Sequence, residues 1–184
     1  NVLQGQAIGA AIHGITPNTF IGYDIKKING YSLNIEKAKR LLSEAGYPDG
    51  KGFPEVRILV NSGNSRNSSV AVELQKQLKA NLNINVNFES LPNVQKYELQ
   101  MHGKSDIYRD AWVADFSSPE SFLSLFVGDG VPADTSAPSF PNTSRYQNAT
   151  YDLYFKKGRD SNIKDSSYAY FMQAEQVLMN DAVI

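Results

Sequence analysis

The 184-residue sequence has no cysteine, which excludes disulfide bonds, thiol nucleophiles and thiolate-bound metals. Histidine is almost as scarce, since His13 and His102 are the only two and neither stands at a metal-ligand spacing. No Gly-x-Ser-x-Gly motif occurs. The glycines of residues 49–52 precede a predicted strand, which is the wrong context for a phosphate-binding loop. We therefore expect no catalytic residue, no metal and no cofactor, and interpret the protein as a non-enzyme.

An excess of basic charge is also missing. The formal net charge is −1, whereas proteins that bind nucleic acid or anionic membranes generally carry a basic face. No apolar run is long enough to span a bilayer, and residues 1–4 lack the charged and apolar regions of a signal peptide. The sequence stops abruptly on the apolar pair at 183–184, so we expect a segment of a longer protein.

The residues that are present suit one globular domain, because 41% are hydrophobic and 20% are charged. Apolar periodicity predicts three strands, at 56–60, 84–88 and 106–113. It predicts helices at 34–45, 67–81, 93–102, from 118 onward, 149–158 and 165–181. This alternation predicts an α/β fold with a mostly parallel or mixed sheet flanked by helices. Residues 1–32 are expected to be mostly loop, and 128–147 a long excursion, either functional or mobile.

The segment Arg109–Pro119 carries the most informative chemistry. It places the only tryptophan, Trp112, between the cation Arg109 and the anion Asp115. The segment lies at the end of a predicted strand, and ligands of open α/β sheets gather at the carboxyl ends of strands. An arginine fork can grip a carboxylate, and an aspartate before the helix start at 118–119 can hold an ammonium. These residues suit a zwitterion such as a peptide, although structural ion pairs use the same groups.

Two further stretches are specific in their order of residues. Residues 34–50 read NIEKAKRLLSEAGYPDG, and residues 112–116 read WVADF. Other matching positions follow in sequence: Tyr31, 74–78, 84–86, Pro119, 122–123, 146–148, 151–152 and 174–175. Together they cover nearly the whole chain, which resembles the bacterial oligopeptide/dipeptide/nickel family of extracytoplasmic solute-binding proteins.

The resemblance implies a two-lobed clamp of the periplasmic-binding-protein type that delivers its ligand to an ABC permease. Residues 1–184 would be a single, incomplete C-terminal lobe, without the N-terminal lobe and the final return segment. The chain would act as a monomer outside the cytoplasm, with no nucleic-acid partner. The resemblance assigns the peptide ammonium to Asp115, a side-chain pocket wall to Trp112 and the peptide carboxylate to Arg109. Asn61 and Arg66, in the loop after the first strand, are weaker candidates for ligand contact.

The sequence departs from the family pattern at a few positions. Phe116 stands where tyrosine is usual, and residues 117–118 are serines in place of a more acidic or amide pair. We expect small effects from both. The excursion at 128–147 is longer than typical.

Several alternatives stay open. Other members of the family bind nickel chelates or oligosaccharides with the same fold. The protein could also sense its ligand and not import it, and the sequence does not distinguish these two roles. A hydrolase that uses Asp110 and Asp115 is disfavoured, because no base, nucleophile or metal cluster accompanies them. Asp106 and Asp110 are interpreted as solvated surface groups.

Overall fold

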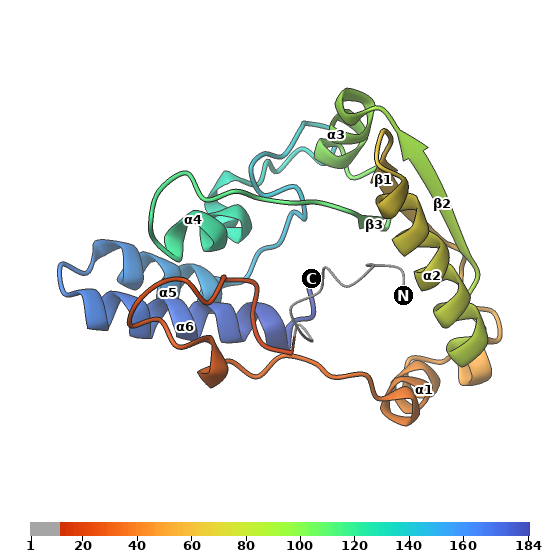
Figure 1. Ribbon diagram of the computed structural model, residues 1–184, viewed down its shortest axis with the longest axis horizontal. Helices are drawn as coiled ribbons and strands as arrows, with labels where there is room; N and C mark the ends of the chain where they lie inside the picture. The colour runs from red at the N-terminus through yellow and green to blue at the C-terminus, as the bar shows by residue number, and fades with distance from the viewer. Residues whose placement is uncertain (1–11) are drawn as a thin grey trace. The chain divides into compact units, whose positions relative to one another are not determined.

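The computed structural model describes residues 12–184, which divide into two units (Figure 1). The first unit contains Leu33–Gln100 and Lys104–Ala111. The second contains the described residues up to Ser32, together with Met101–Gly103 and Trp112–Ile184. Each unit has its own buried apolar cluster. The expectation that residues 1–184 form one C-terminal lobe stays a prediction, and the loop predicted at 1–11 lies outside the described residues.

The first unit is built on a three-stranded sheet in the order β2-β1-β3. The central strand β1 (Val56–Asn61) pairs in parallel with β2 (Val86–Leu91), and Ile58 lies opposite Phe88. On its other edge β1 pairs in parallel with β3 (Ile107–Tyr108). Because parallel neighbours need crossover connections, the chain must leave the sheet between each pair of strands. The predicted α/β fold class is confirmed.

The third strand is much shorter than the sequence predicts. A strand was expected over 106–113, whereas β3 has two residues. Arg109 still donates its N–H to the Leu59 carbonyl at 2.9 Å. The N–H of Ala111, two residues further on, instead meets the Asp110 carboxylate at 2.8 Å, and Asp110 is directed toward a neighbouring helix. The predicted length is wrong, because a β-rich composition does not show where tertiary contacts end the ladder.

Three helices connect or flank these strands: α1 (Ile35–Glu44), α2 (Ser65–Leu82) and α3 (Asn93–Met101). The side chains of Asn34 and Asn64 cap α1 and α2 by accepting hydrogen bonds from backbone N–H groups of the first turn. All three helices agree with the prediction to within two residues at each end. The core between helices and sheet contains Leu42, Ile58, Val60, Ala71, Ile84 and Val86.

The second unit is mainly helical. Its longest elements, α5 (Ala149–Asp160) and α6 (Lys164–Asn180), lie side by side (Figure 1) and agree with the two predicted closing helices. A Cβ on Gly158 would lie 2.6 Å from the Phe171 ring, so glycine is what allows this close approach. Shorter elements are α4 (Glu120–Leu123) and the 3-10 turns η1 (Ile25–Lys27), η3 (Ser124–Phe126) and η4 (Gly128–Gly130). Within the described residues, no helix is both long and apolar enough to cross a membrane.

A buried carboxyl group ties the early part of the second unit to its last helix. Glu175 of α6 is completely buried and accepts hydrogen bonds from the N–H of Thr16 at 2.8 Å and from its Oγ1 at 2.9 Å. The hydroxyl of Tyr23 donates to the same carboxyl group. A Cβ on Gly14 would lie 2.0 Å from Glu175 Oε1, so the segment can lie this close only with glycine there. The pairing satisfies every polar group that it buries.

The excursion at 128–147 is held by its own side chains. Asn142 is 2% exposed, and its Nδ2 donates to the carbonyls of Val127 at 3.0 Å and Tyr146 at 2.8 Å. The Arg145 guanidinium donates to the Met101 carbonyl at 3.1 Å and also to Ala137. These hydrogen bonds join the loop to itself and to Met101 and Val127 outside it.

Candidate ligand-binding site

In a parallel sheet with the strand order β2-β1-β3, a ligand is expected at the carboxyl ends of β1 and β3. The connection after β1 runs to one side and the connection after β2 runs back to the other, which makes β1/β3 the switch point of the sheet. Asn61 is the last residue of β1, and Arg109 follows β3 directly. Two of the five predicted ligand residues are therefore at the position where open α/β sheets bind ligands.

Asn61 and Arg109 are in contact. The Arg109 Nη1 donates to Asn61 Oδ1 over 3.4 Å, and the same oxygen accepts from Asn67 Nδ2 at 3.0 Å. The contact to Arg109 is long, and the guanidinium is exposed to solvent. Within residues 12–184, its other N–H donors make no hydrogen bond, and no carboxylate pairs with it. Arg109 is thus oriented by Asn61 while most of its hydrogen-bonding capacity stays available.

Asp110 belongs to a polar cluster that the sequence did not indicate. Its carboxylate accepts from Gln100 Nε2 at 2.6 Å and from the Tyr97 hydroxyl at 3.2 Å, and lies 3.6 Å from Lys96 Nζ. Asp110 is exposed, with 41% of its side-chain surface accessible, as expected for a solvated surface group, but its carboxylate also has three partners on one helix that the sequence interpretation did not include. The signal that could have found it is the spacing 96, 97 and 100, which places three donors on adjoining faces of one helix.

The same cluster affects the ionisation of its members. Burial lowers the pKa of the Lys96 ammonium, and the nearby Asp110 carboxylate opposes that effect. Burial also raises the pKa of Tyr97, and Asp110 adds to this rise. A buried ammonium is costly without an anionic partner, so Asp110 has a structural reason to stay where it is.

Arg66 lies in the first turn of α2, where its N–H donates to Asn64 Oδ1 at 3.0 Å. Its side chain is exposed and makes no hydrogen bond or ion pair within the described part of the chain. The structure places Arg66 five residues after Asn61 in the same loop-to-helix segment, and shows no contact between their side chains. Arg66 is a weaker candidate than Arg109, as the sequence indicated.

Trp112 and Asp115 belong to the second unit, on the irregular segment before α4. Trp112 is 36% exposed. The N–H of Asp115 donates to Ser121 Oγ at 2.9 Å, which fixes the backbone. Its carboxylate is exposed and accepts no hydrogen bond from any described residue.

The helix start after Asp115 differs in detail from the prediction. Ser118 Oγ does accept a hydrogen bond from the Glu120 N–H at 3.2 Å, as a capping serine would. The cap position itself is Pro119, and α4 has four residues before it continues as a 3-10 turn. A helix this short has only a small dipole at its N-terminus.

The predicted residues thus divide between the two units. Asn61, Arg66 and Arg109 are in the first, where Asn61 and Arg109 touch. Trp112 and Asp115 are in the second, three and six positions after Arg109 along the chain. Among residues 12–184, no group of three or more histidine, aspartate or glutamate side chains could hold a metal ion.

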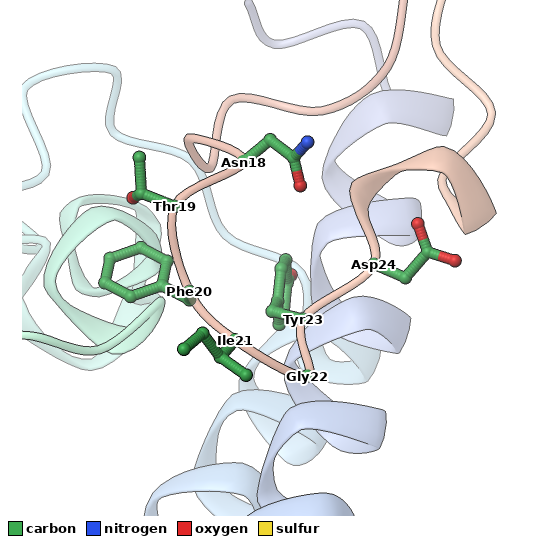
Figure 2. Close-up of a pocket in the computed structure, with 7 residues that line it drawn as sticks. All are labelled: Asn18, Thr19, Phe20, Ile21, Gly22, Tyr23 and Asp24. Atoms are coloured by element: carbon green, nitrogen blue, oxygen red, sulfur yellow. The ribbon is translucent and has the colours of Figure 1, made fainter.

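A surface depression elsewhere in the second unit contains none of these residues. It has a volume of about 320 Å³ and is lined by the seven consecutive residues 18–24. Figure 2 shows this loop as an open arc, with Phe20 directed away from Tyr23. The Tyr23 hydroxyl is already bonded to Glu175. Because a single loop forms the depression and its one buried polar group is occupied, we do not regard it as the ligand site.

Comparison with known proteins identifies a matching family and peptide-binding relatives. Residues 1–134 match the family described as bacterial extracellular solute-binding proteins, family 5 Middle. The periplasmic murein peptide-binding protein MppA of Escherichia coli is 28% identical over 174 residues, which are 92% of this chain and 30% of that protein. The periplasmic oligopeptide-binding protein OppA of Salmonella typhimurium is 30% identical over 152 residues, 81% of this chain and 25% of that protein.

A solved structure shows the same fold. The periplasmic oligopeptide-binding protein OppAIV of Borrelia burgdorferi superimposes with a TM-score of 0.77 at 27% identity, over 97% of this chain and 34% of that one. The chain therefore spans about a third or less of each of these three proteins.

Proposed function

Because this chain belongs to the bacterial extracellular solute-binding proteins of family 5, we propose that it forms part of an ABC importer component that captures oligopeptides or dipeptides. The family is one of solute-binding proteins and not of enzymes, and capture by closure of two lobes requires no chemical step. The observation that carries the proposal is the exposed Arg109 guanidinium at the switch point of the sheet, which contacts Asn61 and which no carboxylate of residues 12–184 neutralises.

Each proposed contact follows from the chemistry of a peptide. The Arg109 fork suits a carboxylate, which it can bind through two parallel hydrogen bonds. The exposed Asp115 carboxylate suits the α-ammonium of a peptide. Trp112 offers an apolar wall that accepts different side chains. The peptide backbone would be held by main-chain hydrogen bonds, with water filling the remaining space, so selectivity among side chains would be low.

The names of the relatives support the location and the partners. MppA and OppA are described as periplasmic, which supports a place outside the cytoplasm for this protein. We propose that an N-terminal lobe of the same protein closes over the ligand, that the closed monomer docks on an ABC permease, and that no nucleic acid takes part. Import and sensing would use the same capture step.

The proposal is tested by ligand-dependent thermal unfolding of the full-length protein. We expect di- to pentapeptides at concentrations far above their Kd to raise Tm, because a ligand that binds only the folded state stabilises it. If an oligosaccharide or a nickel chelate raises Tm and peptides do not, peptide capture is wrong.

Asp115 has its own test. The Asp115→Asn variant should lose far more affinity for peptides with a free amino terminus than for the same peptides N-acetylated, because only the former present an ammonium. Asp129→Asn is the matched control, since Asp129 is an exposed aspartate in η4 of the same unit. Equal losses for free and acetylated peptides would remove Asp115 from the ammonium role.

A further inference from the structure

Arg109 and Asp110 are consecutive residues of opposite charge that do not pair with each other. Arg109 reaches Asn61 at the end of β1. Asp110 is directed to α3, where Lys96, Tyr97 and Gln100 surround its carboxylate. Successive side chains of an extended segment point to opposite faces, so anchoring one of them fixes the direction of the other.

The Asp110 side is the rigid side of this pair. Its two carboxylate oxygens together accept hydrogen bonds from Gln100, from Tyr97 and from the backbone N–H of Ala111. Lys96 is 1% exposed, and its ammonium lies 3.6 Å from the carboxylate and 4.4 Å from the centre of the Tyr97 ring. The Arg109 side, by contrast, is exposed and has one long contact.

Where the chain is not held extended, an aspartate beside an arginine can pair with it, because a carboxylate and a guanidinium attract each other. Such pairing would occupy the groups that a ligand carboxylate needs. Lys96 is 1% exposed and burial lowers the pKa of its ammonium, while Asp110 is the carboxylate paired with it among the described residues, at 3.6 Å. The ion pair with Lys96 therefore keeps the Asp110 carboxylate at α3 and away from Arg109.

We propose that Asp110, held by Lys96, Tyr97 and Gln100 of α3, is a positioning residue that directs Arg109 toward Asn61 and leaves its guanidinium free for the carboxyl terminus of a peptide. This inference rests on the proposed function, and extends it to residues that do not touch the ligand. The preference for a peptide with a free C-terminal carboxylate would then depend on Lys96, Tyr97 and Gln100 of α3 as well as on Arg109.

The test compares a peptide with its C-terminal amide, using the full-length protein and isothermal titration calorimetry. The wild type should bind the free acid more tightly, and Arg109→Met should abolish that preference. Asp110→Ala, and the charge-neutral double variant Lys96→Met/Asp110→Ala, should each lower the preference by roughly threefold or more, a coupling typical of residues in one hydrogen-bonded network. The double variant leaves no unpaired buried charge, so it guards against simple misfolding.

Asp165→Ala is the matched control, because Asp165 is an exposed aspartate of α6 in the other unit. It should leave the preference unchanged. If Arg109→Met removes the preference and the two Asp110 variants keep it, the positioning role is wrong and the proposed function stands. If Arg109→Met keeps the preference, Arg109 is not the carboxylate site, and both assignments fail.

A second measurement needs no peptide. In a crystal structure of the unliganded double variant, we expect the Arg109 guanidinium to have left Asn61. A guanidinium that still lies within hydrogen-bond distance of Asn61 Oδ1 would overturn the proposal whatever the ligand proves to be.

Discussion

Thr16 and Glu175 are 159 positions apart in the sequence and are joined by two hydrogen bonds in the interior of the second unit. Both residues are at most 2% exposed. The carboxyl group also accepts a hydrogen bond from the Tyr23 hydroxyl, so three donors from one early segment meet at a single side chain of α6. A buried polar group of this kind stabilises the fold only while all its partners are present.

The first prediction concerns this carboxyl group. Glu175→Gln keeps the shape of the side chain but replaces one acceptor oxygen by an NH2 donor, which faces the donors of Thr16 or Tyr23. We expect the free energy of unfolding to fall by about 1–3 kcal/mol, the usual cost of an unsatisfied buried polar group. Urea denaturation measures it. Glu36→Gln is the control, since the Glu36 side chain is 87% exposed, and an equally small effect at both positions would contradict the prediction.

The second prediction concerns alkaline pH. Burial, followed by the nearby Glu175, raises the pKa of Tyr23 above its ordinary value of 10.0. The folded protein therefore keeps the phenol proton at a pH where the unfolded chain loses it. The stability that Tyr23 contributes is complete below about pH 10 and is lost as the pH rises further.

Unfolding of the wild type and of Tyr23→Phe at pH 8 to 11 tests the sign. Phenylalanine cannot titrate, so the variant should lose less stability above pH 10 than the wild type does. Burial also raises the pKa of Tyr146 and Tyr151, and lowers that of Lys96, but these effects are common to both proteins and cancel in the difference. Parallel stability curves for the two proteins would show that Tyr23 does not titrate in this way.

The third prediction concerns the contact between α5 and α6. Alanine is ordinarily the better helix former by about 1 kcal/mol, yet a Cβ on Gly158 would lie 2.6 Å from the Phe171 ring. We expect Gly158→Ala to lower the free energy of unfolding by roughly 1–3 kcal/mol, as overpacking does. Gly130→Ala is the matched control, because nothing lies within 4 Å of a Cβ placed there. A Gly158→Ala protein as stable as the control variant would mean that the helices separate without cost.

The fourth prediction concerns Trp112. Removal of its indole should weaken peptides with bulky side chains by roughly tenfold or more, as expected for an aromatic anchor, and should affect glycine-rich peptides less. Calorimetry with the Trp112→Ala variant of the full-length protein measures both. Leu153→Ala, which removes a half-exposed side chain from α5, serves as control. A uniform loss across all peptides would argue against a pocket wall at this position.

Much of the fold could be predicted because its signals are local. The span of α1 follows from a capping asparagine at 34 and from Gly46, which adopts a left-handed conformation with φ of 93° after the helix. Strand β1 follows from a short β-rich run between turn residues. The length of β3 could not be predicted, because the strand ends where Asp110 turns to its partners on α3.

The site shows the same division between local and distant causes. Asn61 comes directly after the predicted strand 56–60, so its place at a strand end follows from the sequence, whereas Arg109 lies inside the predicted strand 106–113 and its place at a strand end does not. Their mutual contact depends on the strand order, which periodicity does not reveal. The role of Asp110 was missed because a lone carboxylate in a charged segment resembles a solvated group, and its partners lie 10 to 14 residues earlier on α3.

The core of the second unit limits the order in which the parts of the protein can fold during synthesis. Tyr23 and Ile28 are buried against residues of α5 and α6, including Phe171 and Leu178. During synthesis the early segment leaves the ribosome long before its partners exist, so its apolar side chains stay exposed until α6 emerges. The strands of the first unit are all available once residue 108 is made. A chain that stops before α6 would therefore keep its sheet and leave residues 12–32 open to proteases.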